Sequence, residues 1–168
     1  MTDPAPTVET SPLFRSSLMR VEPDWLDYND HLNMAFYNVL FDRAVDEMML
    51  SLGLGPDYLK ATGNSFFTAE THVTYLNEIT AHDPVHVDIR VLDADTKRLH
   101  VFEELYHAET GMLSATLEQM LLHVDMSAKR VAPWPDAVTD QLHTLKSVHA
   151  DLPRPPQIGS FIGIRRKR

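Results

Sequence analysis

Residues 33–52 predict a long helix that is apolar around most of its circumference. Apolar side chains recur there at helical intervals, whereas polar side chains form only a narrow strip. The apolar positions are Met34, Phe36, Tyr37, Leu40, Phe41, Ala44, Val45, Met48 and Met49, and the strip is Asp42, Arg43, Asp46 and Glu47. Two glycines at 53 and 55 end the helix, and a proline follows. Such a helix needs other elements wrapped around it.

Five other segments are typical of β-strands: residues 13–21 before the helix, and 66–77, 85–92, 99–108 and 112–125 after it. In residues 85–92, valine and isoleucine alternate with polar side chains. Short turns at 94–97 and 109–111 join consecutive strands, which favours antiparallel pairing. We therefore predict an α+β fold with an antiparallel sheet wrapped around one long central helix. A single sheet has unpaired edges, so we expect a homodimer or a dimer of dimers.

The two ends of the chain differ from this central region. Residues 1–12 hold three prolines and few apolar side chains, and we expect them to be a disordered lead. The main domain is predicted to span residues 13–135. Residues 136–168 follow as a C-terminal helix around 136–149, an extended linker at 152–156 and a basic tail, Arg165-Arg-Lys-Arg168.

The composition excludes several kinds of protein. With no cysteine in 168 residues, disulfides, thiolate metal sites and cysteine nucleophiles are impossible. No apolar run is long enough to span a membrane, and the first residues lack the pattern of a signal peptide, so we expect a cytoplasmic protein. A net charge of −9 argues against a nucleic-acid partner. The basic tail is either solvated or a contact for phosphate groups.

Four polar side chains, Asp27, Asn29, His31 and Asn33, lie within seven residues directly before the long helix. The first amides of a helix have no partner inside it, so this position suits an anion or a polarised carbonyl group. Each residue also has a purely structural interpretation. Asp27 and Asn29 could shape a turn, His31 could hold the loop, and Asn33 could cap the helix.

The segment Asp27-Tyr-Asn-Asp-His-Leu-Asn33, followed by Tyr37, resembles the D-x-x-G-H-x-N…Y signature of hotdog-fold acyl-CoA thioesterases of the 4-hydroxybenzoyl-CoA thioesterase type. Val73-Thr-Tyr-Leu76 and His82-Asp-Pro-Val-His-Val87 are similar to later strands of that family. More narrowly, Pro155-Pro-Gln-Ile-Gly-Ser160 and the Glu70/Glu78 pair around Thr74-Tyr75 resemble the betainyl-CoA thioesterase group of carnitine breakdown. One departure is Asp30, where the family usually has glycine.

The resemblance implies an acyl-CoA substrate and a carboxylate that attacks the thioester or activates water, and Asp27 matches that position. With His31 and Asn33 it forms the expected catalytic set. Backbone amides near Asn33 and Met34 would polarise the thioester carbonyl. We expect Asn29, Met34, Tyr37 and Glu70 to contact substrate, Tyr37 being alternatively a core residue. No serine-elbow motif is present, and we expect no cofactor.

Three further expectations depend on this interpretation. A trimethylammonium acyl group would need aromatic faces, and the candidates are Trp25, Tyr28, Phe36, Phe66, Phe67, Tyr75 and Trp134. The CoA phosphates would need basic groups, and the candidates are Arg98, Lys129, Arg130 and the basic tail. Glu70, His72 and His123 could be drawn as a metal site, but no metal-binding motif supports it, so we expect no metal.

Two alternatives remain. A hotdog hydratase or dehydratase would carry Asp-x-Asn-Pro-x-His, with four residues between Asp and His, whereas Asp27 and His31 have three between them and no proline. A non-catalytic acyl-CoA-binding domain would have no need of a carboxylate at position 27.

Overall fold

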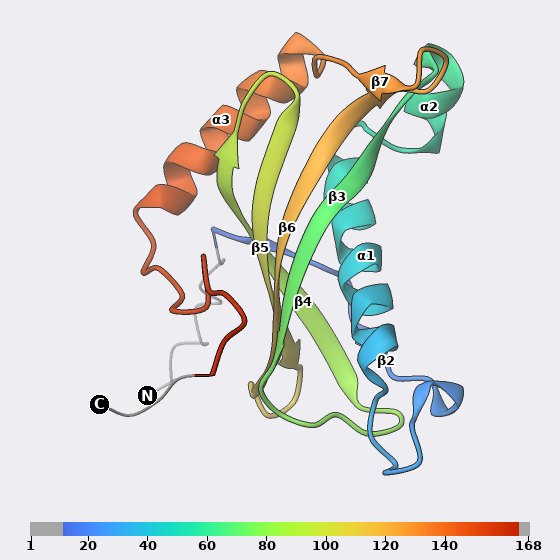
Figure 1. The fold of residues 1–168 in the computed structure, drawn as a ribbon, viewed down its shortest axis with the longest axis vertical. Coiled ribbons are helices and arrows are strands. Elements are labelled where there is room, and N and C mark those ends of the chain that lie inside the picture. Colours follow the sequence, from blue (N-terminus) through green and yellow to red (C-terminus); the bar gives the residue numbers. More distant parts are fainter. Residues whose placement is uncertain (1–11, 165–168) are drawn as a thin grey trace, which may run out of the picture.

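The computed structural model describes residues 12–164, and its central element is helix α1, Met34–Ser51. The helix packs against one face of a curved antiparallel sheet (Figure 1). Its side chains buried against the sheet include Tyr37, Leu40, Phe41 and Met48. The predicted central helix is thus confirmed to within one residue at each end.

The sheet is antiparallel throughout, with the strand order β1-β4-β5-β6-β3. Its long strands are β3 (Asn64–Tyr75), β4 (Pro84–Ala94), β5 (Arg98–His107) and β6 (Leu113–Asp125). A two-residue strand β7, Arg130–Val131, pairs with β6. The predicted α+β class and the antiparallel sheet around one helix are confirmed.

The strand predicted at residues 13–21 is divided in two, β1 (Phe14–Arg15) and β2 (Met19–Arg20), both paired with β4. Ser16 causes the break, because its hydroxyl takes the place of a backbone acceptor. The Ser16 amide donates to Val87 O at 2.9 Å, while the Val87 amide donates to Ser16 Oγ at 3.0 Å. The register shifts by one residue there, and alternation alone does not reveal such a shift.

Two short helices were not predicted. The 3₁₀ helix η1 spans Pro23–Trp25, and α2 spans Pro56–Thr62. The glycine-proline signal that ends α1 also begins α2, since Pro56 occupies the first turn, where its missing amide costs nothing. Gly63, with φ of +71°, then ends α2 in the left-handed region.

The outer face of the sheet is covered by helix α3, Asp136–Ala150, so the sheet lies between α1 and α3 (Figure 1). Val138 and Leu142 of α3 belong to the same hydrophobic core as α1. Residues 1–11 and 165–168, which include nearly all of the predicted lead and the whole basic cluster, lie outside the described residues. Within residues 12–164, no helix is long and apolar enough to cross a membrane.

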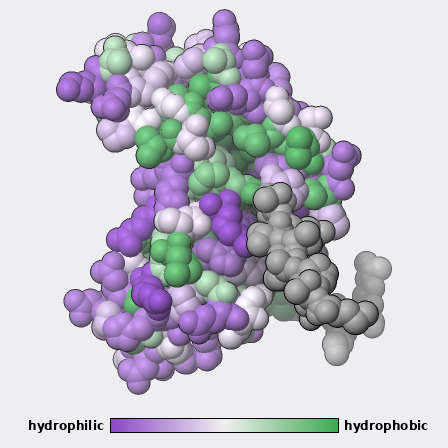
Figure 2. All heavy atoms as spheres, turned by 180° about the vertical axis from the view of Figure 1, so that it is seen from behind, coloured by the Kyte–Doolittle hydropathy of each residue, from purple (hydrophilic) through white to green (hydrophobic). Residues whose placement is uncertain are grey.

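The strand β3 is an edge of the sheet, because it pairs with β6 on one side only. Five consecutive residues, 67–71, are exposed in it, and Phe67 is among them. On the face seen from behind, hydrophilic residues dominate both ends of the molecule and apolar residues reach the surface mainly in the upper half (Figure 2). Of the described elements, β3 is the long strand with unpaired backbone groups along one side.

The end of α3 is fixed by His149, which is buried. Its Nδ1 accepts a hydrogen bond from the Val91 amide at 2.9 Å, so the proton lies on Nε2, which faces Pro12 O at 3.0 Å. The net effect of the surroundings is to lower the pKa of His149. Burial is the largest cause, and the nearby Arg90 charge acts in the same direction, whereas the backbone contacts with Pro12 and Val91 raise the pKa. The folded protein therefore requires the neutral imidazole.

We predict that His149 makes the protein less stable in acid. Because its pKa is lower when folded, the unfolded chain binds more protons below about pH 6.5, and the stabilisation is lost as the pH falls through that range. The destabilisation by His149→Gln, measured by urea unfolding, should therefore be larger at about pH 7.5 than at about pH 5.5. His143→Gln, at an exposed position on the same helix, is the control. An equal loss at both pH values would contradict the prediction.

Candidate active site

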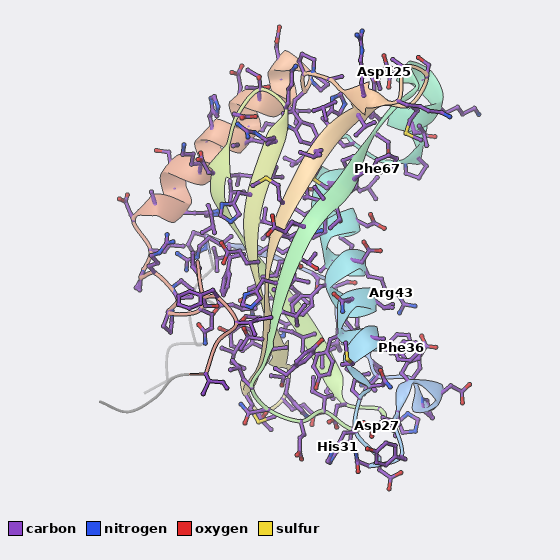
Figure 3. All side chains as sticks on the ribbon, viewed as in Figure 1. Asp27, His31, Phe36, Arg43, Phe67 and Asp125 are labelled. Carbon is purple, nitrogen blue, oxygen red and sulfur yellow. The ribbon has the colours of Figure 1, made fainter. Side chains whose placement is uncertain are left out.

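The polar segment before α1 forms a tight loop at one end of the sheet. Leu26 and Leu32 form an isolated antiparallel bridge, and the Asp27 amide donates to His31 O at 2.9 Å. The Leu32 amide donates to Ile79 O at 2.8 Å, which ties the loop to the segment after β3. Figure 3 shows Asp27 and His31 at the end of the molecule opposite Phe67 and Asp125. The loop therefore holds Asp27 and His31 in fixed positions beside the start of α1.

The Asp27 carboxylate is half-buried and oriented by its own turn. Its Oδ1 accepts a hydrogen bond from the Asn29 amide at 2.8 Å, the geometry of an Asx turn. Within residues 12–164, Oδ2 has no hydrogen-bond donor. Asn29 is exposed and does not line the pocket described below, so in one protomer its backbone orients Asp27 while its side chain faces solvent.

Asp30 occupies the position where the family signature has glycine, and its backbone explains that preference. Its φ is +61°, in the left-handed region that glycine enters freely and that aspartate tolerates. The Asp30 amide donates to Asp27 O at 3.1 Å and closes the turn. The side chain is exposed and outside the pocket lining, so this second carboxylate faces solvent.

The first amides of α1 have different partners. The Asn33 amide donates to Trp25 O at 2.9 Å, and the Asn33 side chain accepts from the Ala35 amide at 3.0 Å. The Phe36 amide donates to Asn33 O at 2.9 Å. The Met34 amide, in contrast, has no acceptor within the described part of the chain. Of the two amides expected to polarise a carbonyl, the one at Met34 is available and the one at Asn33 is occupied.

A pocket of about 310 Å³ opens at this point. Its lining residues are Asp27, His31, Leu32, Met34, Tyr37, Tyr75, Leu76, Asn77 and Glu78. Four predicted site residues, Asp27, His31, Met34 and Tyr37, are thus brought together. Asn33 lies immediately before Met34 as the cap of the helix.

Two tyrosines form one corner of the pocket. The rings of Tyr37 and Tyr75 meet edge to face, with centroids 5.1 Å apart. The Tyr37 hydroxyl donates to Asn77 O at 3.5 Å, and that of Tyr75 donates to Met34 O at 3.2 Å. Burial raises the pKa of Tyr37 to about 12, helped by Tyr75, Glu78 and Asp27. Tyr37 therefore keeps its proton at neutral pH.

The residues after β3 contribute a carboxylate that the sequence analysis did not assign to the site. Glu78 Oε2 lies 3.2 Å from His31 Nε2. Asn77 fixes this segment, since its Nδ2 donates to Leu113 O at 2.8 Å. A signal existed, because Tyr75 lies near the end of the strand predicted at 66–77 and Glu78 follows that strand directly. Which end of the sheet the strand reaches depends, however, on the topology.

Glu70 lies elsewhere in the protomer. It is opposite Met120 in the β3–β6 pair and lines a different pocket, with His100 and Glu118. Glu70, which was expected to contact substrate, therefore does not lie beside the Asp27 loop of its own protomer, because β3 is long and Glu70 lies in its middle. His123, the third residue of the metal alternative, contacts Tyr58 Oη and Ala132 O through its two ring nitrogens.

Most of the aromatic candidates also have other partners. Trp25 stacks on Phe36, and the Arg43 guanidinium lies 4.9 Å from the Trp25 ring. Trp134 is buried beside His123. Phe66 and Phe67 line a separate pocket against α2. Of the seven candidates, Tyr75 is the one that lines the Asp27 pocket in the described chain.

Comparison with known proteins identifies the family. The family model of the thioesterase-like superfamily matches residues 21–142, which hold the Asp27 loop, α1 and all four long strands. The chain belongs to the thioesterase-like superfamily. The betainyl-CoA thioesterase of Pseudomonas aeruginosa is 40% identical over 144 residues, covering 86% of this chain and 91% of that protein. The chain is thus an acyl-CoA thioesterase, a thioester hydrolase.

Other relatives extend the comparison. An L-carnitine dehydrogenase/betainyl-CoA thioesterase of Rhizobium sp. is 35% identical over 147 residues. The matched region covers 88% of the present chain but only 29% of the Rhizobium protein. The solved structure of Staphylococcus aureus SAV2348 in complex with CoA superimposes with a TM-score of 0.84 at 30% identity, covering 91% of this chain and 96% of that chain. These findings favour the hydrolase over the hydratase and the non-catalytic binding domain.

We predict that Met34→Pro disables the thioesterase and leaves the fold intact. Proline removes the one open amide, and it is well tolerated at the first position of a helix. Asn33 has φ −61° and ψ 140°, the extended backbone that a following proline requires. Loss of one carbonyl-polarising donor should lower kcat by about 10²–10³-fold. Met34→Leu should keep most activity, and a fully active, folded Met34→Pro enzyme would exclude this amide.

Proposed function

We propose that the thioesterase hydrolyses betainyl-CoA, with the Asp27 carboxylate as nucleophile or general base and the Met34 amide polarising the thioester carbonyl. The observation that carries this proposal is the placement of an oriented carboxylate and an open helix-terminal amide at one pocket. Both groups are held by backbone hydrogen bonds, so little reorganisation is needed when substrate binds.

The other polar groups would support Asp27. The pocket lining includes no serine, and the chain has no cysteine, so the carboxylates and His31 are the candidate groups for attack or proton transfer. Asp27 could attack the thioester carbonyl directly, which breaks the C–S bond, expels the CoA thiolate and leaves a mixed anhydride that water then cleaves. Alternatively, Asp27 could deprotonate the attacking water. The contact with Glu78 would orient His31 toward the substrate. Asn33 would act by fixing the first turn of the helix.

The acyl specificity would come from the tyrosine corner and from charge. A trimethylammonium group binds to the faces of aromatic rings and favours nearby carboxylates. Tyr37 and Tyr75 supply the rings, and Asp27 and Glu78 supply the negative charge. None of the lining residues is lysine or arginine. This arrangement supports a cationic acyl group, as the name of the Pseudomonas aeruginosa relative indicates for that protein.

The working unit would be a homodimer, or a dimer of dimers, formed through β3. A long edge strand with unpaired backbone groups favours pairing with a second copy. The pocket is also incomplete in one protomer, because Met34, Tyr75 and Leu76 on its rim are exposed by 64%, 44% and 40%. A second chain against β3 would cover these side chains. A solution mass of one chain would contradict the dimer.

Asp27→Asn should lower the rate of thiol release from betainyl-CoA by at least about 10²-fold, because the amide neither attacks nor accepts a proton at neutral pH. The turn should persist, since the amide oxygen can still accept from the Asn29 amide. Asp30→Asn is the matched control, as it removes an exposed carboxylate three residues away. Equal losses in the two variants would reject the catalytic role of Asp27. No turnover of any acyl-CoA by the folded wild type would reject the substrate assignment.

The tyrosine corner predicts a preference for positive charge. Wild type should favour betainyl-CoA over 3,3-dimethylbutanoyl-CoA, its neutral isostere, by about ten- to thirtyfold in kcat/KM. Tyr75→Leu should reduce that preference, whereas Tyr75→Phe, which keeps the ring, should retain it. A preference unchanged in Tyr75→Leu would remove Tyr75 from the specificity site.

A further inference from the structure

One carboxyl group lies in the hydrophobic core, at the middle of strand β5. Glu103 is 0% exposed and alternates along the strand with the core residues Val101 and Leu105. Its register neighbours, Ile89 of β4 and Leu117 of β6, are core residues as well. The side chain therefore points from the sheet toward α1, at a position where the pattern of the strand requires an apolar residue.

The carboxyl group of Glu103 has no polar partner within residues 12–164. Neither of its oxygens is hydrogen-bonded there. None of the ion pairs formed by the described residues includes it. Burying a carboxylate without a donor or a cation costs far more free energy than burying the uncharged acid. The fold therefore favours the protonated form of Glu103.

The charged groups that face Glu103 do not compensate it, because they are acidic. Helix α1 contributes Asp42, whose charge acts on Glu103 and also on Asp46, one turn further along the helix. The neighbouring strands contribute the apolar side chains of Ile89 and Leu117 at the register positions beside Glu103. The surroundings of Glu103 are thus apolar on the side of the sheet and negative on the side of the helix.

The remaining charged residues of α1 are engaged elsewhere. Arg43 is the one cation of the helix, and its guanidinium lies 4.9 Å from the Trp25 ring and 3.6 Å from Glu22 Oε1. Glu47 accepts hydrogen bonds from the amide and the hydroxyl of Ser17. The helix therefore offers no positive charge to the carboxyl group beneath it.

This environment makes the stability of the fold depend on pH. Burial, and then the charge of Asp42, raises the pKa of Glu103 well above its usual range. In the unfolded chain a glutamate ionises at about pH 4.3. Between that pH and the folded pKa, the folded protein binds more protons than the unfolded chain, so its stability falls as the pH rises. Above the folded pKa, a charge lies in the core.

We propose that Glu103 is a proton-operated switch beneath α1. Uncharged, it lets the helix rest on β5. When hydroxide removes its proton, forming water, the remaining carboxylate repels Asp42 and draws water under the helix. Because α1 is one continuous helix of 18 residues, a displacement at Asp42 also moves its first turn and the Met34 amide. Thioester hydrolysis would then stop at high pH; this step rests on the proposed function, whereas the ionisation of Glu103 does not.

Infrared spectroscopy tests the protonation directly. At about pH 7 the wild type should show the carbonyl band of an uncharged carboxyl group, and the band should disappear reversibly as the pH is raised to about 10. Glu103→Gln should lack this band. Glu109→Gln, at an exposed turn position, is the matched control and should keep it. A wild type without the band at about pH 7, or one that keeps it at about pH 10, would overturn the switch.

Urea unfolding tests the effect on stability. Relative to Glu103→Gln, the unfolding equilibrium constant of the wild type should rise at least about tenfold from about pH 5 to about pH 9, since one unit of pKa difference is a factor of ten. His149 is present in both proteins, so its titration cancels. Glu109→Gln should follow the wild type. Glu103→Met, similar in volume and uncharged, replaces Glu103→Gln if the glutamine variant does not fold.

Activity is followed with any acyl-CoA that the wild type hydrolyses. The kcat of the wild type and of Glu109→Gln should fall as the infrared band disappears, whereas Glu103→Gln should keep its kcat over the same range. An equal alkaline loss in all three proteins would overturn the switch. So would a Glu103→Gln protein less stable than wild type at about pH 9, because Glu103 would then be charged and paired with a cation of a second chain or a ligand. Failure of the wild type to hydrolyse any acyl-CoA would instead count against the proposed function, and the infrared and unfolding results would still decide on the switch.

Discussion

The hydrogen bond from the Asn33 amide to Trp25 O determines the form of the site. It joins the loop to the start of α1 and, with the Asn33 side chain on the Ala35 amide, leaves the Met34 amide unpaired between two occupied ones. A helix N-terminus always has orphan amides. At the start of α1, the Asn33, Ala35 and Phe36 amides all have acceptors, and the amide left open belongs to Met34, a residue that lines the pocket. The helix must also be buried and rigid for that amide to stay in place, and the wrapped sheet provides this.

Much of the fold follows from local pattern. Because α1 is apolar around most of its circumference, it requires a sheet to cover it. Consecutive strands joined by short turns favour antiparallel order. Local features that depend on one atom are less predictable. The Ser16 hydroxyl shifts the register of the first strand, and the positive φ of Asp30 becomes visible only when the turn is built. Glu103 is another example: it lies fully buried on β5 with no hydrogen-bond partner in the described chain, and burial raises its pKa.

The site was predictable where it is contiguous in sequence and not where topology assembles it. Asp27, His31, Met34 and Tyr37 lie within eleven positions and share the pocket. Glu78 joins them only because β3 ends beside the loop, where the Leu32 amide reaches Ile79 O. Glu70 is eight residues earlier, in the middle of the edge strand β3, where it lies opposite Met120. Spacing along the chain therefore decides which of two similar carboxylates lies beside Asp27, and sequence alone does not show where the strand ends.

The structural and catalytic interpretations of Asp27 need not be alternatives. Its Oδ1 shapes the turn by accepting from the Asn29 amide, and that same bond fixes the direction of Oδ2. A free carboxylate would lose rotational freedom on reaching the thioester, whereas one already held by its turn loses little, which favours reaction. The same reasoning applies to Asn33, whose capping of the helix keeps the Met34 amide in position. Residues that appear to be ordinary turn and cap residues can thus be the ones that preorganise the chemistry, because an Asx turn and a helix cap are the simplest rigid frames available to a carboxylate and an amide.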